Sequence, residues 1–163
     1  MMLTGLAYIP ISAKSAEEVC HALQVINLRF REINAAKEEQ SVSIAIEDLV
    51  AGADITDRPV YAPQRIATLF AVGILTQGAP AGIDNANTCV CVLKDGDGNA
   101  IVTKTFNTAN QPATSGYSDL GTLHATNKTL AANEAVTFSV TQGATADMPA
   151  FLLILSAQVS STT

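Results

Sequence analysis

Residues 134–159 read EAVTFSVTQGATADMPAFLLILSAQV, two apolar segments separated by a loop of small and polar residues. In the first segment Val136, Phe138 and Val140 alternate with Thr and Ser. This period of two is typical of a strand with one buried face. The second segment, 151–159, is almost continuously apolar, which predicts a strand covered on both faces. The stretch therefore favours a β fold.

Similar signals occur upstream. Strands are predicted at 42–46, 65–76, 88–94, 100–106 and, more weakly, 120–126. In 65–76 the pattern predicts one inward face, made of Ile66, Thr68, Phe70, Val72 and Ile74. Asp95-Gly96-Asp97-Gly98-Asn99 predicts a hairpin turn, because Gly and Asn tolerate positive φ.

The segment 52–63 is rich in Asp and Pro and predicts an irregular connection or extended arm. The chain thus has about seven or eight predicted strands joined by turns rich in Thr, Asn and Gly. This pattern predicts an antiparallel β-sandwich that resembles a jelly roll.

The N-terminal region predicts a different element. Ser15-Ala16-Glu17-Glu18 is a capping box, and no Gly or Pro follows until after about Glu39. A long helix is expected there, with two domains as a result: an N-terminal arm and oligomerising helix (1–40) and a β-sandwich (41–163).

The predicted helix carries a heptad seam. Apolar residues spaced three and four apart place Leu23 and Phe30 at heptad position a, and Val19, Ile26 and Ile33 at position d. Leu at a with Ile at d leans toward trimers or tetramers over dimers. The predicted oligomer interface is Val19, Leu23, Ile26, Phe30 and Ile33. Val25 and Leu28 form a second packing face, suited to the chain's own sandwich. The alternative is that the seam itself packs on that sandwich.

Composition limits the function classes. Only 15% of the 163 residues are charged and the net charge is −6, which favours assembly over a highly solvated monomer and argues against nucleic-acid binding. A monomer solubilised by Thr, Asn and Ser is the alternative. No apolar run reaches the roughly 18 residues of a membrane span, and the N-terminus lacks the basic region of a signal peptide.

Catalytic and metal-binding signals are sparse. The three cysteines (Cys20, Cys89 and Cys91) make no disulfide framework, and Cys89 and Cys91 are expected to share one strand face as small apolar residues. His21 and His124, the latter on a predicted strand, stand in no catalytic or zinc motif. We therefore expect no enzyme and no cofactor.

Glycan binding is the stronger competitor, since many sandwiches stack sugars on exposed aromatic rings. Tyr61 and Tyr117 are candidates for such stacking, whereas Phe70, Phe138 and Phe151 are expected in the core.

Two loops echo each other. Thr76-Gln77-Gly78-Ala79-Pro80-Ala81-Gly82 resembles Thr141-Gln142-Gly143-Ala144-Thr145-Ala146-Asp147. This similarity has two interpretations. Either the two loops lie at one end of the sandwich and make equivalent contacts, or, more simply, a glycine ends the preceding strand in each case.

The block Glu134–Leu155 resembles the closing hairpin of small tailed-phage structural proteins, including head decoration (cement) proteins and head fibres. Two apolar strands are joined by a Thr-Gln-Gly and Ala-Asp-x-Pro-Ala connection. The resemblance extends as a pattern over about 59–159. Of the strict motif only Gln142, Gly143, Asp147 and Pro149 carry over, with a structural role.

The resemblance implies a capsid decoration protein on the virion exterior, made in the host cytoplasm and commonly trimeric. Its partner would be the major capsid protein, whose neighbouring subunits would be clamped by an N-terminal arm and by edges of the sandwich. The candidate arm residues are Leu3, Tyr8, Ile9 and Ile11. The heptad helix is not a constant feature of that family, so a head or tail fibre module that binds a receptor or glycan is the alternative.

Overall fold

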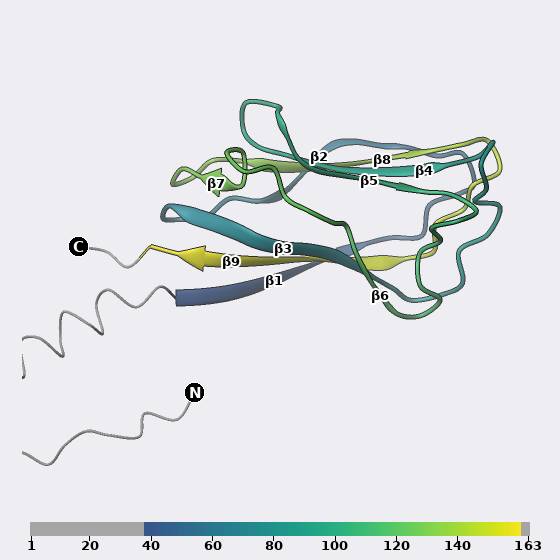
Figure 1. The fold of residues 1–163 in the computed structure, drawn as a ribbon, viewed down its shortest axis with the longest axis horizontal. Helices are drawn as coiled ribbons and strands as arrows, with labels where there is room; N and C mark the ends of the chain where they lie inside the picture. Colours follow the sequence, from purple (N-terminus) through teal and green to yellow (C-terminus); the bar gives the residue numbers. More distant parts are fainter. Residues whose placement is uncertain (1–37, 161–163) are drawn as a thin grey trace, which may run out of the picture. The chain divides into compact units, whose positions relative to one another are not determined.

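The computed structural model describes residues 38–160, and these residues form β-strands without a helix (Figure 1). The strands are β1 (Glu38–Ile46), β2 (Ile55–Tyr61), β3 (Ala67–Thr76), β4 (Cys89–Lys94), β5 (Ala100–Phe106), β6 (Tyr117–Asp119), β7 (Thr129–Leu130), β8 (Val136–Gln142) and β9 (Phe151–Val159). The predicted N-terminal helix, its interface and packing residues and the candidate arm lie outside the described residues, so they stay predictions.

The strands form two antiparallel sheets. Sheet A has the order β1-β9-β3-β6, with β7 also paired to β3, and sheet B has the order β2-β8-β4-β5. The first half of the chain pairs with the second in nested fashion: β1 with β9, β2 with β8, β3 with β6 and β4 with β5. Figure 1 shows the two sheets as two layers. The prediction of a mainly β, antiparallel fold is confirmed.

The core lies between the sheets. Phe138 of sheet B and Phe151 of sheet A meet edge to face, with ring centroids 6.1 Å apart, a favoured geometry for aromatic pairs. Val136 and Val140 are fully buried beside them, as the alternation predicts. Fully burying such side chains contributes about 1.5–3 kcal/mol each.

Cys89 and Cys91 share the inner face of β4, as predicted, and both are fully buried. The hydrogen bond with Cys89, together with burial, raises the pKa of the Cys91 thiol well above its usual value. Both residues therefore serve as small apolar core residues.

The predicted hairpin of β4 and β5 is confirmed. The Asp95 N–H donates to the Asn99 carbonyl (2.9 Å), and Gly98 adopts φ +85°. The Asp95 carboxylate accepts the backbone N–H groups of Asp97 and Asn99. These bonds within the turn hold the Asp95 side chain.

The face predicted for β3 is wrong in its first half. Phe70 is an extra residue at a β-bulge between Leu69 and Ala71. A bulge shifts the alternation by one residue, so Ala67 and Leu69 are buried before it while Val72 and Ile74 are buried after it. Ile66 and Phe70 are instead exposed by 53% and 51%, and Phe70 is not a core residue.

Two segment assignments are also wrong. The segment 52–63 contains a strand, β2, whose pairing with β8 has two register shifts and which accommodates Pro59 because it lies at a sheet edge. No strand forms at 120–126: Leu120 is buried from a connecting segment, and His124 is exposed. The short strands β6 and β7 flank that segment instead.

Both ends of the β region differ from expectation. Glu38 and Glu39 belong to β1, whereas the helix was predicted to run to about Glu39. The stretch 134–159 is not a hairpin, because β8 lies in sheet B and β9 in sheet A. Its central loop crosses between the layers.

Candidate interaction surface

The outer face of sheet A carries mostly small or apolar side chains. Three cross-strand rows compose this surface, here named face A: Ala45, Leu152, Leu75 and Tyr117; Ser43, Ile154, Gly73 and Asp119; Ser41, Ser156 and Ala71. Leu152 and Ile154 are half-buried on β9, so the outer side of that strand is not fully covered by the described residues. The prediction that both faces of this strand are covered is thus only partly met.

Tyr117 lies directly over Gly73. A side chain at position 73 would collide with the phenol ring, so the glycine makes room for it. Covering a strand glycine with a neighbouring aromatic ring is a known way to stabilise sheets. Burial, followed by the charge of Asp119, raises the pKa of Tyr117. The ring is still 51% exposed, so one side of it faces outward.

Among the three rows of face A the one charged residue is Asp119, at the β6 edge of the second row. The nearest further acid in the register is Glu39, at the start of β1. Phe70 adds a second exposed ring at the bulge of β3. A contiguous surface with little charge and with exposed aromatic side chains is typical of a protein contact.

The outer face of sheet B is more polar. Its β5 and β8 positions are Thr103, Thr105, Thr137, Ser139 and Thr141. Lys94 Nζ lies 2.6 Å from Asp57 Oδ1, and the Ser139 hydroxyl donates to the same carboxylate. These two hydrogen bonds, that from Lys94 first, lower the pKa of Asp57. Hydroxyl groups and an ion pair suit this face to solvent.

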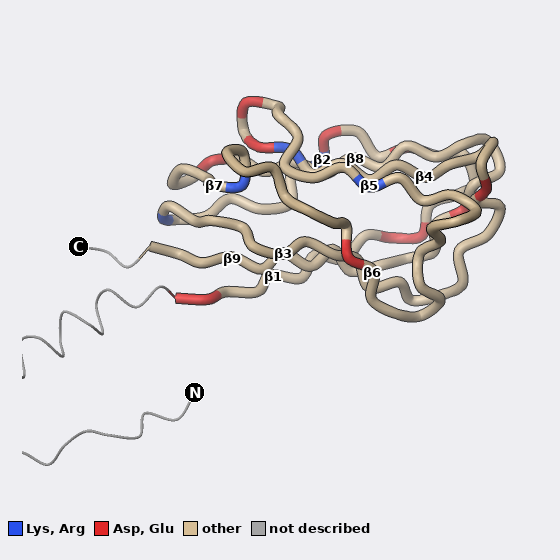
Figure 2. Tube along the Cα trace, viewed as in Figure 1, with Lys and Arg blue, Asp and Glu red and all other residues tan. Residues whose placement is uncertain are grey.

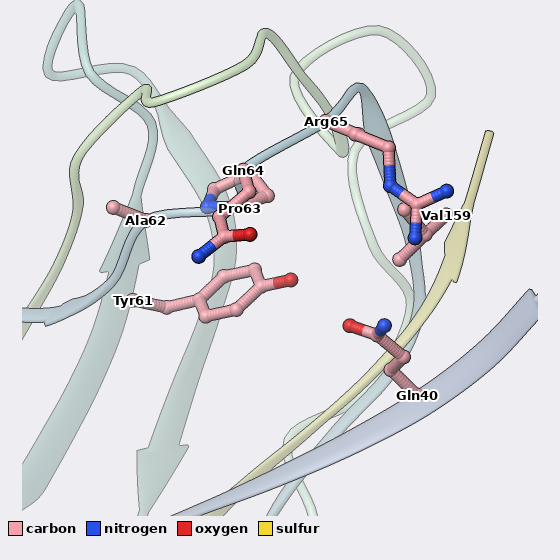
Figure 3. Close-up of a pocket in the computed structure, with 7 residues that line it drawn as sticks. All are labelled: Gln40, Tyr61, Ala62, Pro63, Gln64, Arg65 and Val159. Carbon is pink, nitrogen blue, oxygen red and sulfur yellow. The ribbon is translucent and has the colours of Figure 1, made fainter. Parts of the chain in front are cut away.

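A small polar cleft lies at the end of the sandwich where β1 begins (Figure 3). It encloses about 230 Å³ and is lined by Gln40, Tyr61, Ala62, Pro63, Gln64, Arg65 and Val159. Arg65 donates to Glu38 Oε2 (3.1 Å) and to the Ser160 carbonyl (3.4 Å). Burial raises the pKa of Tyr61. The volume is below the roughly 300–1,000 Å³ of typical ligand sites.

The two candidate sugar-stacking residues are therefore separate. Tyr61 lines the cleft and Tyr117 belongs to face A. His124 is exposed and its Nδ1 lies 3.1 Å from the Thr126 hydroxyl. Among residues 38–160 no group of three His, Cys, Asp or Glu side chains is placed to hold a metal ion. In the same range no helix is long and apolar enough to cross a bilayer.

The two echoing loops lie side by side. Ala81 and Asp147 exchange backbone hydrogen bonds of 3.0 and 2.8 Å. Gly78 lies against Pro149, where a Cβ would come within 3.2 Å of the proline ring. The expectation of two loops at one end of the sandwich is met, but the contacts found are between the loops themselves.

Gln142 ties this end of the molecule together. The side chain is 7% exposed; its amide donates to the Ala53 carbonyl (2.8 Å) and accepts from the Met148 N–H (2.9 Å). Its backbone N–H donates to Asp54 Oδ1 (2.8 Å). The resemblance implies a structural role for Gln142, and these three hydrogen bonds are the contacts through which it can have that role.

Comparison with protein-family models, curated proteins and solved structures finds no match to this chain. The sequence did not predict face A, because the bulge at Phe70 shifts the alternation of inward and outward side chains along β3. The alternation of Ser41, Ser43 and Ala45 with Val42 and Ile44 was the one signal that could have located its β1 part.

Proposed function

We propose that this chain is a structural virion protein that decorates and stabilises a phage head through protein–protein contact. The observation that carries the proposal is face A. It offers a surface with one charge, Asp119 at its edge, an exposed ring at Tyr117 and a second exposed ring at Phe70 on the bulge of β3. Protein interfaces are depleted of charge and enriched in aromatic residues at their centre. On this proposal the partner is the major capsid protein, and the location is the capsid exterior.

The strand order supports a jelly-roll assignment within the sandwich. Without β7, sheet A has four strands like sheet B, and two four-stranded sheets built from nested pairs, first strand with last, are what a jelly roll of two Greek keys requires. Strand β7 is an addition at the edge of β3. Jelly rolls serve viral capsids and lectins alike, so the fold alone does not select the function.

A homotrimer is part of the proposal. It rests on the trimers common in the family that the chain resembles and on the predicted seam of Val19, Leu23, Ile26, Phe30 and Ile33, whose Leu at a and Ile at d lean toward trimers or tetramers over dimers. Five buried apolar side chains could contribute about 7–15 kcal/mol per helix as an upper bound.

Light scattering of the purified chain tests the oligomer. The wild type is expected to have three times the chain mass of 17.0 kDa. Leu23→Asp should dissociate it, whereas Gln24→Asp, off the predicted seam, should not. A wild-type chain that runs as a monomer contradicts the trimer.

Cryo-electron microscopy of the source particle tests the location. Density for the sandwich on the outer capsid surface, with face A against a capsid subunit, is expected. Density at the tail tip, or face A turned to solvent, contradicts the decoration role.

The second candidate is a glycan- or receptor-binding module of a fibre, and the polar cleft favours it. Tyr61, Arg65 and two glutamine amides converge there (Figure 3). A glycan array should then give one reproducible ligand class that is lost with Tyr61→Ala and kept with Tyr117→Ala. An array on which both variants bind like wild type rules out the cleft.

A further inference from the structure

Among residues 38–160 the two sheets have five outer strands, and these strands differ in how well they are protected against pairing with another chain. They are β1, β6 and β7 in sheet A and β2 and β5 in sheet B. An outer strand presents unpaired backbone N–H and carbonyl groups, so proteins block it with proline, lysine, bulges or short length.

Four of these strands carry such protection. β2 contains Pro59 and two register shifts, and Asp57 adopts φ +44° within it. β6 and β7 are only three and two residues long. β5 carries Lys104 and pairs with β4 through a register shift near Lys94.

β1 lacks each of these devices. Its nine residues pair with β9 from Glu38↔Val159 to Ile46↔Phe151 without a register shift. Its sequence, EEQSVSIAI, has no Pro, Gly or Lys. Among residues 38–160, β9 alone pairs with β1. The free edge is therefore long, regular and open in this part of the chain.

We propose that the free edge of β1 is a strand-addition site, and that its occupant is an extended segment of another protein with basic residues near both of its ends. Main-chain hydrogen bonds would supply the affinity, as in other strand-addition complexes. The inference rests on the edge itself and holds whether or not the chain decorates a capsid.

Charge decides which occupant fits. Glu38 and Glu39 open the strand, shown in red in Figure 2, and Glu47 and Asp48 follow its last residue. All four are exposed, and within residues 38–160 Glu38 is the one of them that forms an ion pair, with Arg65. Two β1 strands paired about a two-fold axis would place the acids of one beside those of the other, which is unfavourable. A basic-ended segment from a different protein meets opposite charge at both ends.

The site is continuous with face A. Ser41, Ser43 and Ala45 belong both to β1 and to the rows of face A. An added strand would extend sheet A and enlarge that face. One partner could then contact the backbone edge and face A together.

The test uses the full chain and a nine-residue probe peptide of alternating threonine and valine with a lysine at each end. Backbone amide exchange is followed by mass spectrometry. With peptide at about ten times its Kd, the fast-exchanging amides of 38–46 should slow about tenfold, and those of β5 should not change. A peptide with glutamate at both ends should bind about fivefold or more weakly, because two favourable cross-strand pairs become repulsive.

Two controls separate strand addition from simple charge attraction. A lysine-ended peptide with a central proline keeps its charge but loses a backbone donor, and it should give no protection. The double variant Glu39→Lys/Asp48→Lys should reverse the preference between the two end-charged peptides. The proposal is overturned by equal protection from the proline peptide, by protection confined to other strands, or by none up to about 1 mM peptide, the weak end of measurable affinity.

Discussion

Replacing Gln142 tests whether one buried amide holds the loop end of the sandwich. In Gln142→Ala the Met148 N–H loses its acceptor, and Met148 is fully buried. An orphaned buried donor costs about 1–3 kcal/mol, and the lost bond to the Ala53 carbonyl about 0.5–1.5 kcal/mol more. We therefore expect the free energy of unfolding to fall by about 2–4 kcal/mol.

Urea denaturation followed by circular dichroism measures this change, at one fixed protein concentration because subunit dissociation would shift the midpoint. Thr141→Val is the matched control. Thr141 is the exposed neighbour on β8, and a surface change that keeps the β-branch should stay within about 0.5 kcal/mol of wild type.

A third variant separates hydrogen bonding from packing. Gln142→Met keeps most of the side-chain volume and removes the polar atoms, so it should lose nearly as much stability as Gln142→Ala. A Gln142→Met protein as stable as wild type would refute the reasoning, since the amide would then act only by filling space. A loss below about 1 kcal/mol in both variants would refute it equally, being less than one orphaned buried donor should cost.

Three further predictions concern other parts of the sandwich. Gly143→Ala should cost more than about 1 kcal/mol by denaturation, because its Cβ would come within 2.5 Å of the backbone of a facing loop; a neutral result would show that the loop yields. The carboxyl of Asp57 should titrate below 3.8 in an NMR pH series and move back toward that value in Lys94→Met. Because its folded pKa is lowered, its small stabilisation is present above the unfolded pKa and is lost as pH falls through the folded one. Phe70→Thr should leave stability within about 0.5 kcal/mol, while Phe138→Ala costs about 3–5 kcal/mol; equal losses would place Phe70 in the core after all.

Local signals predicted much of the β domain. Val136, Phe138 and Val140 alternate with polar residues at a period of two, so the burial of each side chain can be predicted from the residues next to it in the sequence. The turn from Asp95 to Asn99 was predictable for the same reason, since its hydrogen bonds join residues at most four apart. Cys89 and Cys91 share a face because they are two residues apart in a strand.

The sequence by itself therefore determined the β class, the β4–β5 hairpin and the inward face of β8. Only the tertiary structure decided that β9 lies between β1 and β3, that the chain after Gln142 crosses to the other sheet, and that Phe70 is exposed at a bulge. Each of these depends on pairing between residues far apart in the chain, such as Ala71 with Ser156. Face A and the open edge of β1 follow from that pairing, because side-chain alternation specifies which way a residue faces within its strand but not which strand lies beside it.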